Sequence, residues 1–376
     1  MTRKERLERI IRREKADRPA VNFYEAGGFL VDTEDPDEYN IYNSESWIKL
    51  LEITEEESDI IRMVPPDIVE RNPAYNDFFH TEVYEKDNSR FTRTTLKAGG
   101  REMYSLTRRD KELDTIWTIK HLLENEEDLK TYMSLPQEVF QAEYTVDNLK
   151  KVEAGLGDRG IVMVDTGDPI CMAADLFEFG TFTLMAFTEP LLFHKLLEKL
   201  SEHILERTQF ASENFPGHLW RIYGPEYATE PYLPPKMFKE YVQRYTGPMV
   251  EIIHKYDGIV RLHSHGKINN VLNYMVEMGA DAVDPVEPAP QGDVSLEYMA
   301  ENYGDKLVLF GNIEITDIMN LSPDDFEKIV RQSVGEGKKA EGFVLMPSAS
   351  PYGREIPESA IENYRTMIRV VKEMET

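Results

Sequence analysis

Two histidines separated by one residue, His263 and His265, are the side chains whose type and spacing point most directly to chemistry. Residues two apart on a strand share a face, so both imidazoles would project the same way. Such a pair can bind one divalent metal ion, and Glu287, 22 residues after His265, could complete a set of two histidines and one glutamate. That set is typical of catalytic zinc, which keeps an open position for water or substrate. The residues equally allow the histidines to bond neighbouring carboxylates or carbonyls, with Glu287 paired to Arg261.

Three more polar residues directly follow expected strands: Glu226, Asn312 and Asp168. Glu226 is a candidate general base or further ligand, and the alternative is a solvated loop acid. Asn312 could donate a hydrogen bond to a substrate oxygen or cap the next turn. Asp168 is either a substrate contact or the cap of the following helix. The sequence leaves these alternatives open.

The elements that must position these residues alternate along the chain. Strands are expected at 20–24, 59–64, 160–165, 219–223, 258–264, 281–286, 306–310 and 342–346. Amphipathic helices are expected between the later strands and at the end, at 189–207, 235–256, 267–278, 294–303, 323–335 and 357–374. Functional side chains of such folds lie just past the carboxyl ends of the strands, where the candidate residues occur.

This alternation predicts an α/β protein with a parallel sheet, most economically closed as a TIM (β/α)8 barrel. An open doubly wound sheet is the alternative. An opening helix over residues 2–15 forms an N-terminal extension, and the alternating pattern over 78–120, with its Gly-Gly turn, predicts a β-hairpin insertion. The absence of a linker-like stretch predicts one domain over residues 1–376.

Composition narrows the function classes. The chain has 43 basic and 69 acidic residues, a formal charge of −26, which argues against a nucleic-acid or anionic-membrane partner. Cys171 is the single cysteine, so an internal disulfide and a multi-thiolate zinc module are excluded. The charged start of the chain lacks a signal-peptide core, and no apolar run is long enough for a bilayer. A cytoplasmic protein is expected.

Residues 260–312 contain His263-Ser264-His265-Gly266, then Gly279-Ala280-Asp281, then Leu309-Phe310-Gly311-Asn312. In that order these elements resemble the uroporphyrinogen-decarboxylase superfamily, and a fainter likeness extends over most of the chain. The superfamily includes decarboxylases and zinc-dependent methyltransferases that exchange methyl groups with corrinoid proteins or thiols. The resemblance implies the same barrel.

The decarboxylase side of the family fits poorly at the loop after the first strand. The decarboxylases carry an Arg-Gln-Ala-Gly-Arg sequence there, which grips the carboxylates of the substrate. This chain has Tyr24-Glu25-Ala26-Gly27-Gly28, with an acid and no arginine. Since an acidic loop repels a polycarboxylate, porphyrinogen decarboxylation is not expected.

The methyltransferase motif fits better. It pairs a His-x-Cys with a distal Cys, and methionine synthase, which has a related barrel, adds a Glu between them. His263 takes the His position, His265 the first Cys position and Glu287 the Glu position, while Ser348, 61 residues after Glu287, falls at the distal Cys. Without thiolates, the site would hold a metal with harder nitrogen and oxygen ligands, which favours polarising an oxygen over activating a thiol.

The resemblance therefore implies a zinc-dependent (or other divalent metal-dependent) methyltransferase that moves a methyl group from a small methylated substrate to a corrinoid protein. Expected partners are that substrate, the corrinoid protein and a second copy of the chain in a homodimer. The alternative is a non-porphyrin decarboxylase or lyase in which His263, His265 and Glu226 handle protons. A non-catalytic binder that retains the barrel is the third possibility.

Overall fold

The computed structural model describes residues 1–374. Eight parallel strands form one sheet in the order β1-β14-β13-β12-β11-β10-β9-β2. They are β1 (Ala20–Val21), β2 (Ile60–Val64), β9 (Gly160–Gly167), β10 (Leu219–Tyr223), β11 (Ile259–His263), β12 (Ala282–Asp284), β13 (Val308–Ile313) and β14 (Phe343–Pro347). These are the eight predicted strands, and they confirm the TIM-like (β/α)8 fold.

The two ends of this sheet meet at Asp59, just before β2. Its backbone N–H donates to the Val21 carbonyl in β1 at 2.7 Å. Its buried carboxylate accepts hydrogen bonds from Arg6 at 2.7 Å, Arg18 at 2.9 Å and the Val21 amide at 2.9 Å. Because Arg6 belongs to α1 (Arg3–Ile11), the predicted N-terminal extension is fastened to the seam where the sheet closes.

Side chains alternate between the barrel interior and the surrounding helices. On β11, Ile259 belongs to the interior apolar cluster, whereas Val260 and Leu262 belong to the larger cluster that packs against the helices. Arg261 and His263 share the face of Ile259 and are buried in the interior. This strand therefore turns Arg261 and His263 inward and its apolar face toward the helices.

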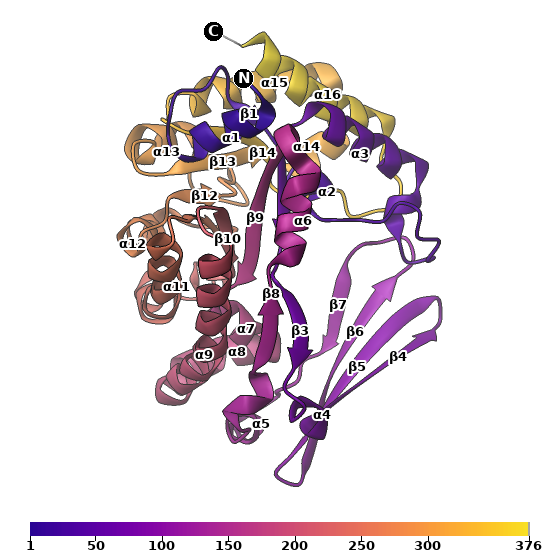
Figure 1. Cartoon of the computed structure of the whole chain (residues 1–376), viewed down its shortest axis with the longest axis vertical. Helices are drawn as coiled ribbons and strands as arrows, with labels where there is room; N and C mark the ends of the chain where they lie inside the picture. The colour runs from indigo at the N-terminus through magenta and orange to yellow at the C-terminus, as the bar shows by residue number, and fades with distance from the viewer. Residues whose placement is uncertain (375–376) are drawn as a thin grey trace.

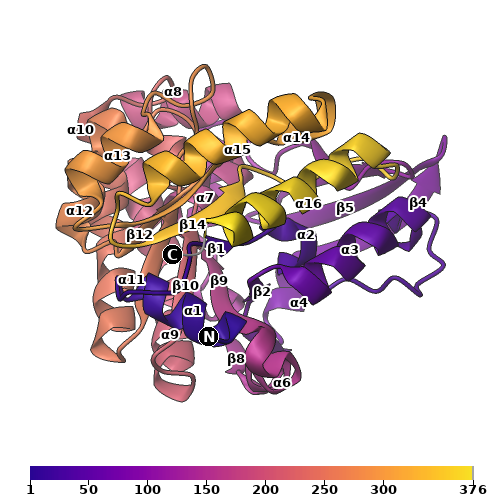
Figure 2. The same ribbon diagram turned by 90° about the horizontal axis from the view of Figure 1, so that it is seen from above.

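Amphipathic helices cover the outside of the sheet. They are α3 (Glu45–Glu57), α6 (Asp147–Leu156), α9 (Pro190–Asn214), α11 (Arg244–Lys255), α12 (Leu272–Met278), α13 (Leu296–Tyr303), α15 (Pro323–Gly337) and α16 (Glu358–Glu373). Figure 2 shows α15 and α16 running alongside each other, with α3 next to α16. Within residues 1–374, no helix combines the length and the apolar character needed to cross a membrane.

Several short helices were not expected from the sequence. The predicted helix over 235–256 is divided into α10 (Pro235–Phe238), a π-helical turn and α11. Two helices, α7 (Pro169–Leu176) and α8 (Phe179–Thr188), follow β9, while α14 (Ile315–Asn320) follows β13. Shorter helices are α2 (Glu25–Gly28), α4 (Tyr75–Phe78) and α5 (Glu126–Met133). Of these, α8 contributes directly to the pocket described below.

The predicted hairpin insertion is present and is larger than one hairpin. It forms a four-stranded antiparallel sheet of β4 (Phe79–Lys86), β5 (Ser89–Ala98), β6 (Arg101–Asp110) and β7 (Ile116–Lys120). The chain enters and leaves it through the antiparallel pair β3 (Asp67–Arg71) and β8 (Ala142–Thr145). Figure 1 shows this sheet projecting from the barrel.

Candidate active site

His263, the last residue of β11, is buried at the mouth of the barrel. Its Nδ1 lies 2.8 Å from Asp284 Oδ2 and 3.3 Å from the Tyr24 hydroxyl. Burial lowers the pKa of His263 to about 4 in spite of the Asp284 carboxylate. The ring is therefore neutral near pH 7, with Nδ1–H donating to Asp284 and Nε2 carrying a free lone pair.

A layer of paired charges lies beneath this histidine. Arg261 donates to both oxygens of Asp284, at 2.5 and 2.6 Å, and Arg221 lies 3.4 Å from Asp165. Burial alone would raise the pKa of Asp284, but the charge of Arg261 and the hydrogen bonds from Arg261 and His263 outweigh it and hold that pKa well below its usual range. Asp284 thus remains ionised and fixes both the guanidinium and the imidazole.

His265 is anchored in the same way by a different carboxylate. Its Nδ1 lies 2.8 Å from Glu287 Oε1, while Glu287 Oε2 accepts the Gly266 amide at 2.7 Å. Burial would lower the pKa of His265, but the hydrogen bond and charge of Glu287 prevail and raise it. The centroids of the His263 and His265 rings are 4.7 Å apart, at an interplanar angle of 88°. The two neighbouring imidazoles consequently differ in their affinity for a proton.

Glu226 lies on the turn that follows β10. Its Oε2 accepts the Gly224 amide at 3.2 Å, and burial raises its pKa. Gly224 has φ +119°, and a Cβ there would lie 2.3 Å from the Cβ of Cys171, so only glycine fits. This constraint fixes the start of the turn that carries Glu226.

Asp168 lies behind that turn and is fully buried. Its Oδ1 accepts the Cys171 amide at 2.8 Å and caps α7, and its Oδ2 accepts the Thr246 hydroxyl at 2.9 Å. Burial raises the pKa of Asp168 to about 7. Of its two predicted roles, the structure provides the helix cap.

Ser348 and Asn312 occupy the neighbouring strand ends. Ser348 Oγ donates to Glu314 Oε2 at 3.2 Å and accepts the Ile315 amide at 3.3 Å. Burial raises the pKa of Glu314 to about 7, and within residues 1–374 neither its Oε1 nor Asn312 Oδ1 has a hydrogen-bond partner. Ser348 is therefore held by Glu314 and the start of α14, whereas Asn312 keeps an unused acceptor.

The nitrogen and oxygen donors at the barrel mouth fit a metal ion only in part. Both histidines have Nδ1 bound to a carboxylate, the arrangement that orients metal-ligating histidines and leaves Nε2 to the metal. Glu287, however, acts as the partner of His265. Across the described part of the chain, no group of three or more His, Cys, Asp or Glu side chains is arranged to hold a metal ion. The imidazoles fit as two ligands, and the expected three-ligand set is not assembled.

Asp284 and Glu314 are site residues that the sequence reasoning missed. Asp284 pairs in register with His263 across β11 and β12. The strand expected over 281–286 is three residues long in the structure, Ala282–Asp284, so Glu287 lies in the loop beyond it. The inward alternation of Ala282 and Asp284 was the available signal. Glu314 lies two residues beyond Asn312, and the same alternation pointed to it.

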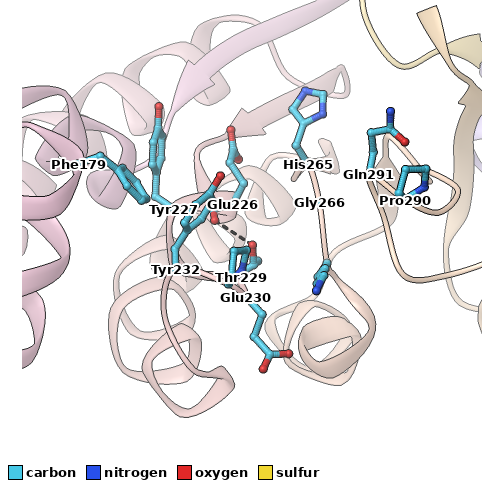
Figure 3. A pocket seen from close by; sticks show the side chains of 12 residues that line it. Phe179, Glu226, Tyr227, Thr229, Glu230, Tyr232, His265, Gly266, Pro290 and Gln291 are labelled. Carbon is cyan, nitrogen blue, oxygen red and sulfur yellow. Dashed lines mark hydrogen bonds between the residues drawn. The ribbon is translucent and has the colours of Figure 1, made fainter. Parts of the chain in front are cut away.

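A pocket of about 420 Å³ opens beside His265. Its lining comes from α8, the turn after β10, and the loops after β11 and β12: Phe179, Glu226, Tyr227, Thr229, Glu230, Pro231, Tyr232, His265, Gly266, Lys267, Pro290 and Gln291. Figure 3 shows the aromatic rings on one side, Pro290 and Gln291 on the other, and His265 between them. Glu226 and His265, both predicted from the sequence, share this pocket.

Comparison with known proteins gives a family match and a similar fold. The family model of uroporphyrinogen decarboxylase matches residues 111–374. A solved methyltransferase from Methanosarcina mazei superposes over 100% of both chains, with a TM-score of 0.63 and 15% identity. A putative vitamin-B12 independent methionine synthase from Listeria monocytogenes covers 61% of this chain and 69% of its own, with a TM-score of 0.41 and 12% identity. No curated protein sequence matches the chain.

Proposed function

Because the chain belongs to the uroporphyrinogen decarboxylase family, we propose that it is an enzyme that transfers a methyl group from a small methylated substrate to a corrinoid protein. The observation that carries this proposal is the pair of anchored imidazoles beside a substrate-sized pocket. Glu25, in the loop where the decarboxylases have arginines, disfavours a polycarboxylate substrate.

The pocket residues would bind and orient the substrate. Glu226 lines the pocket with His265 and would contact the group that carries the methyl. Asn312, whose Oδ1 has no partner within residues 1–374, would bind a polar substrate group at the mouth. When the methyl leaves, the heteroatom keeps the electron pair of the broken bond. Positioning of the methyl toward the corrinoid partner is the main task of these side chains.

The proposal includes a zinc-like divalent metal ion, which would supply a Lewis acid to a substrate heteroatom that has a lone pair. His263 and His265 would provide two of its ligands, whereas Glu287, the expected third, is bonded to His265. Asp284 holds the ring of His263 whether or not an ion is bound, and its position is set by Arg261. Ser348, bonded to Glu314, would orient the neighbouring strand end.

The test combines elemental analysis with a transfer assay. The purified chain should carry about one metal ion, as a single catalytic site requires. It should also demethylate a member of a methylated-substrate panel only when a Co(I) corrinoid is added. His263→Ala should lose both properties, whereas His80→Ala, an exposed histidine of the inserted sheet, should keep both. A metal-free wild type that transfers no methyl group would contradict the proposal.

A second candidate function is a non-porphyrin decarboxylase or lyase. It is favoured by the pocket itself, in which the Glu226 carboxylate and the His265 imidazole both form part of the lining. Such groups suit acid–base chemistry without a partner protein. Release of CO2 from a small acid in the absence of any corrinoid would support this function, provided that Glu226→Gln abolishes it.

A further inference from the structure

Three aromatic side chains form one wall of the pocket beside His265. The Phe179 and Tyr232 rings meet edge to face with centroids 4.5 Å apart, and the Tyr227 centroid lies 6.2 Å from that of Phe179. Tyr232 keeps 44% of its surface exposed. Figure 3 shows these rings grouped opposite Pro290 and Gln291, with Glu226 next to them. We refer to Phe179, Tyr227 and Tyr232 as the aromatic wall.

The wall is held by its own local structure. Glu178 caps α8 by accepting the Gly180 and Thr181 amides at 2.9 and 3.2 Å, which fixes the first residue of that helix, Phe179. Tyr232 N–H donates to the Thr229 carbonyl at 2.9 Å. Thr229 Oγ1 in turn donates to the Glu226 carbonyl at 2.9 Å. The rings and the Glu226 carboxylate are therefore presented together, before any ligand binds.

Acidic and basic side chains are not balanced around the aromatic wall. Arg221 and Arg261 lie in the interior with Asp165 and Asp284 as partners. Two acids, Glu226 and Glu230, line the pocket. The opposing side chains are Lys267 at the pocket rim and His265, which is already bonded to Glu287. The mouth therefore carries an excess of negative charge facing aromatic rings.

We propose that this pocket binds a small methylated ammonium cation, held between the aromatic wall and the Glu226 carboxylate. Aromatic faces attract cations through their quadrupole, and cages of this kind recognise quaternary ammonium groups. Methyl groups on the nitrogen prevent a close salt bridge but leave an apolar, positively charged surface that rings can cover. A carboxylate-bearing aryl ether would fit the rings and be repelled by the acids.

The inference rests on the proposed function in one respect: it makes the cation the methyl donor. A quaternary nitrogen has no lone pair for a Lewis acid, so its own positive charge, and not a metal ion, makes the amine a leaving group. In that step, the bond between one methyl carbon and the nitrogen breaks, and the reduced cobalt of the corrinoid partner supplies the electron pair of the new bond. The nitrogen keeps the electron pair of the broken bond and leaves as a neutral tertiary amine. No proton is required, so Glu226 can remain ionised throughout and its attraction for the product is lost when the charge disappears.

The closing experiment measures binding separately from turnover. Calorimetric titration of the full chain with choline is compared with titration by 3,3-dimethylbutan-1-ol, which has the same shape with carbon in place of nitrogen and no charge. Choline should bind on the order of tenfold more tightly. Tyr232→Leu and Glu226→Gln should each weaken choline binding severalfold without changing the weak binding of the neutral alcohol.

Tyr298→Leu is the matched control, since Tyr298 is 40% exposed but lies on α13, away from the aromatic wall. It should bind choline like the wild type. Equal affinity for choline and the neutral alcohol would overturn the proposal, as would choline binding that Tyr232→Leu leaves unchanged. Demethylation of a neutral ether by a chain that does not bind choline would overturn the cation site while supporting methyl transfer. Selective choline binding without methyl transfer would support the cation site and contradict the proposed function.

Discussion

The interior of the barrel and the pocket at its mouth are both rich in charged groups. The two regions differ in whether those groups have oppositely charged partners. In the interior, each arginine has an aspartate: Arg261 with Asp284, and Arg221 with Asp165. In the pocket, Glu226 accepts one backbone amide, and among residues 1–374 no cationic side chain is bonded to it. The interior is internally neutralised, whereas the pocket is left with charge to use on a ligand.

This difference separates orientation from recognition. Buried ion pairs give little net stability, but removing one partner leaves the other charge unpaired where water solvates it poorly. The interior pairs therefore fix geometry, including the ring of His263 through Asp284. Glu226 is only partly buried, so its unpaired carboxylate costs less to maintain than one in the interior and is available to attract a cation. The two regions can be distinguished by substitution.

The largest effect on stability is expected from a substitution in the barrel interior. Arg261→Met removes the partner of Asp284 and should lower the free energy of unfolding by about 3–5 kcal/mol, because a buried carboxylate is left uncompensated. Denaturant titration followed by circular dichroism measures this loss. Lys267→Met, at the pocket rim, is the control and should change stability by no more than about 0.5 kcal/mol. Equal effects of the two substitutions would remove the distinction between the regions.

A smaller effect is expected at Asp168, which lies buried between the two regions and lacks a charged partner. Its folded-state pKa of about 7 is above the usual value, so the protonated form is favoured by folding. Its contribution to stability is complete below pH ~4 and is lost as the pH rises toward 7. From pH 5 to 7, the wild type should lose about 2 kcal/mol more than Asp168→Asn. Parallel stability curves for the two proteins would show that Asp168 is already ionised when folded.

The smallest effect on stability is expected from a substitution in the turn that supports the pocket. Thr229→Val removes the hydroxyl that donates to the Glu226 carbonyl and should cost about 1 kcal/mol of stability. Choline affinity should fall as well, since the turn also supports Tyr232. Thr208→Val, which removes a comparable buried hydroxyl-to-carbonyl bond within α9, should cost similar stability and leave choline affinity intact. A loss of affinity in Thr208→Val instead would show that general loosening, and not the turn, controls the pocket.

The fold was predictable because its signals are periodic and repeated. Six late strands alternate with helices, and each segment buries apolar residues on a face set by its own period. The division of the expected 235–256 helix and the extra helices α7 and α8 were not predictable in the same way. A π-helical turn and short capped helices depend on tertiary contacts, such as the cap of Asp168 on α7, which periodicity does not record.

The positions of the candidate site residues could be predicted from the sequence better than the contacts between their side chains. The strand-end rule located His263, His265, Glu226 and Asn312, because the carboxyl ends of parallel strands converge. It did not reveal that Asp284 would bind His263, since that contact depends on the register between β11 and β12. The aromatic wall could not be predicted from the sequence either, because Phe179 belongs to α8, a helix that the sequence pattern did not indicate.

The pairing of β1 with β14 has a consequence for the order in which the molecule can be completed. Ala20 and Val21 pair with Val344 and Leu345, so β1 can form this pairing only after β14, more than 300 residues later, has been synthesised. The inserted strands β4–β7, by contrast, pair only with their neighbours in sequence and can assemble early during synthesis. Until β14 emerges, the edge of β1 lacks this partner, and the mouth lacks the strand end that carries Ser348. A nascent chain can therefore hold a finished insertion long before it holds a complete barrel mouth.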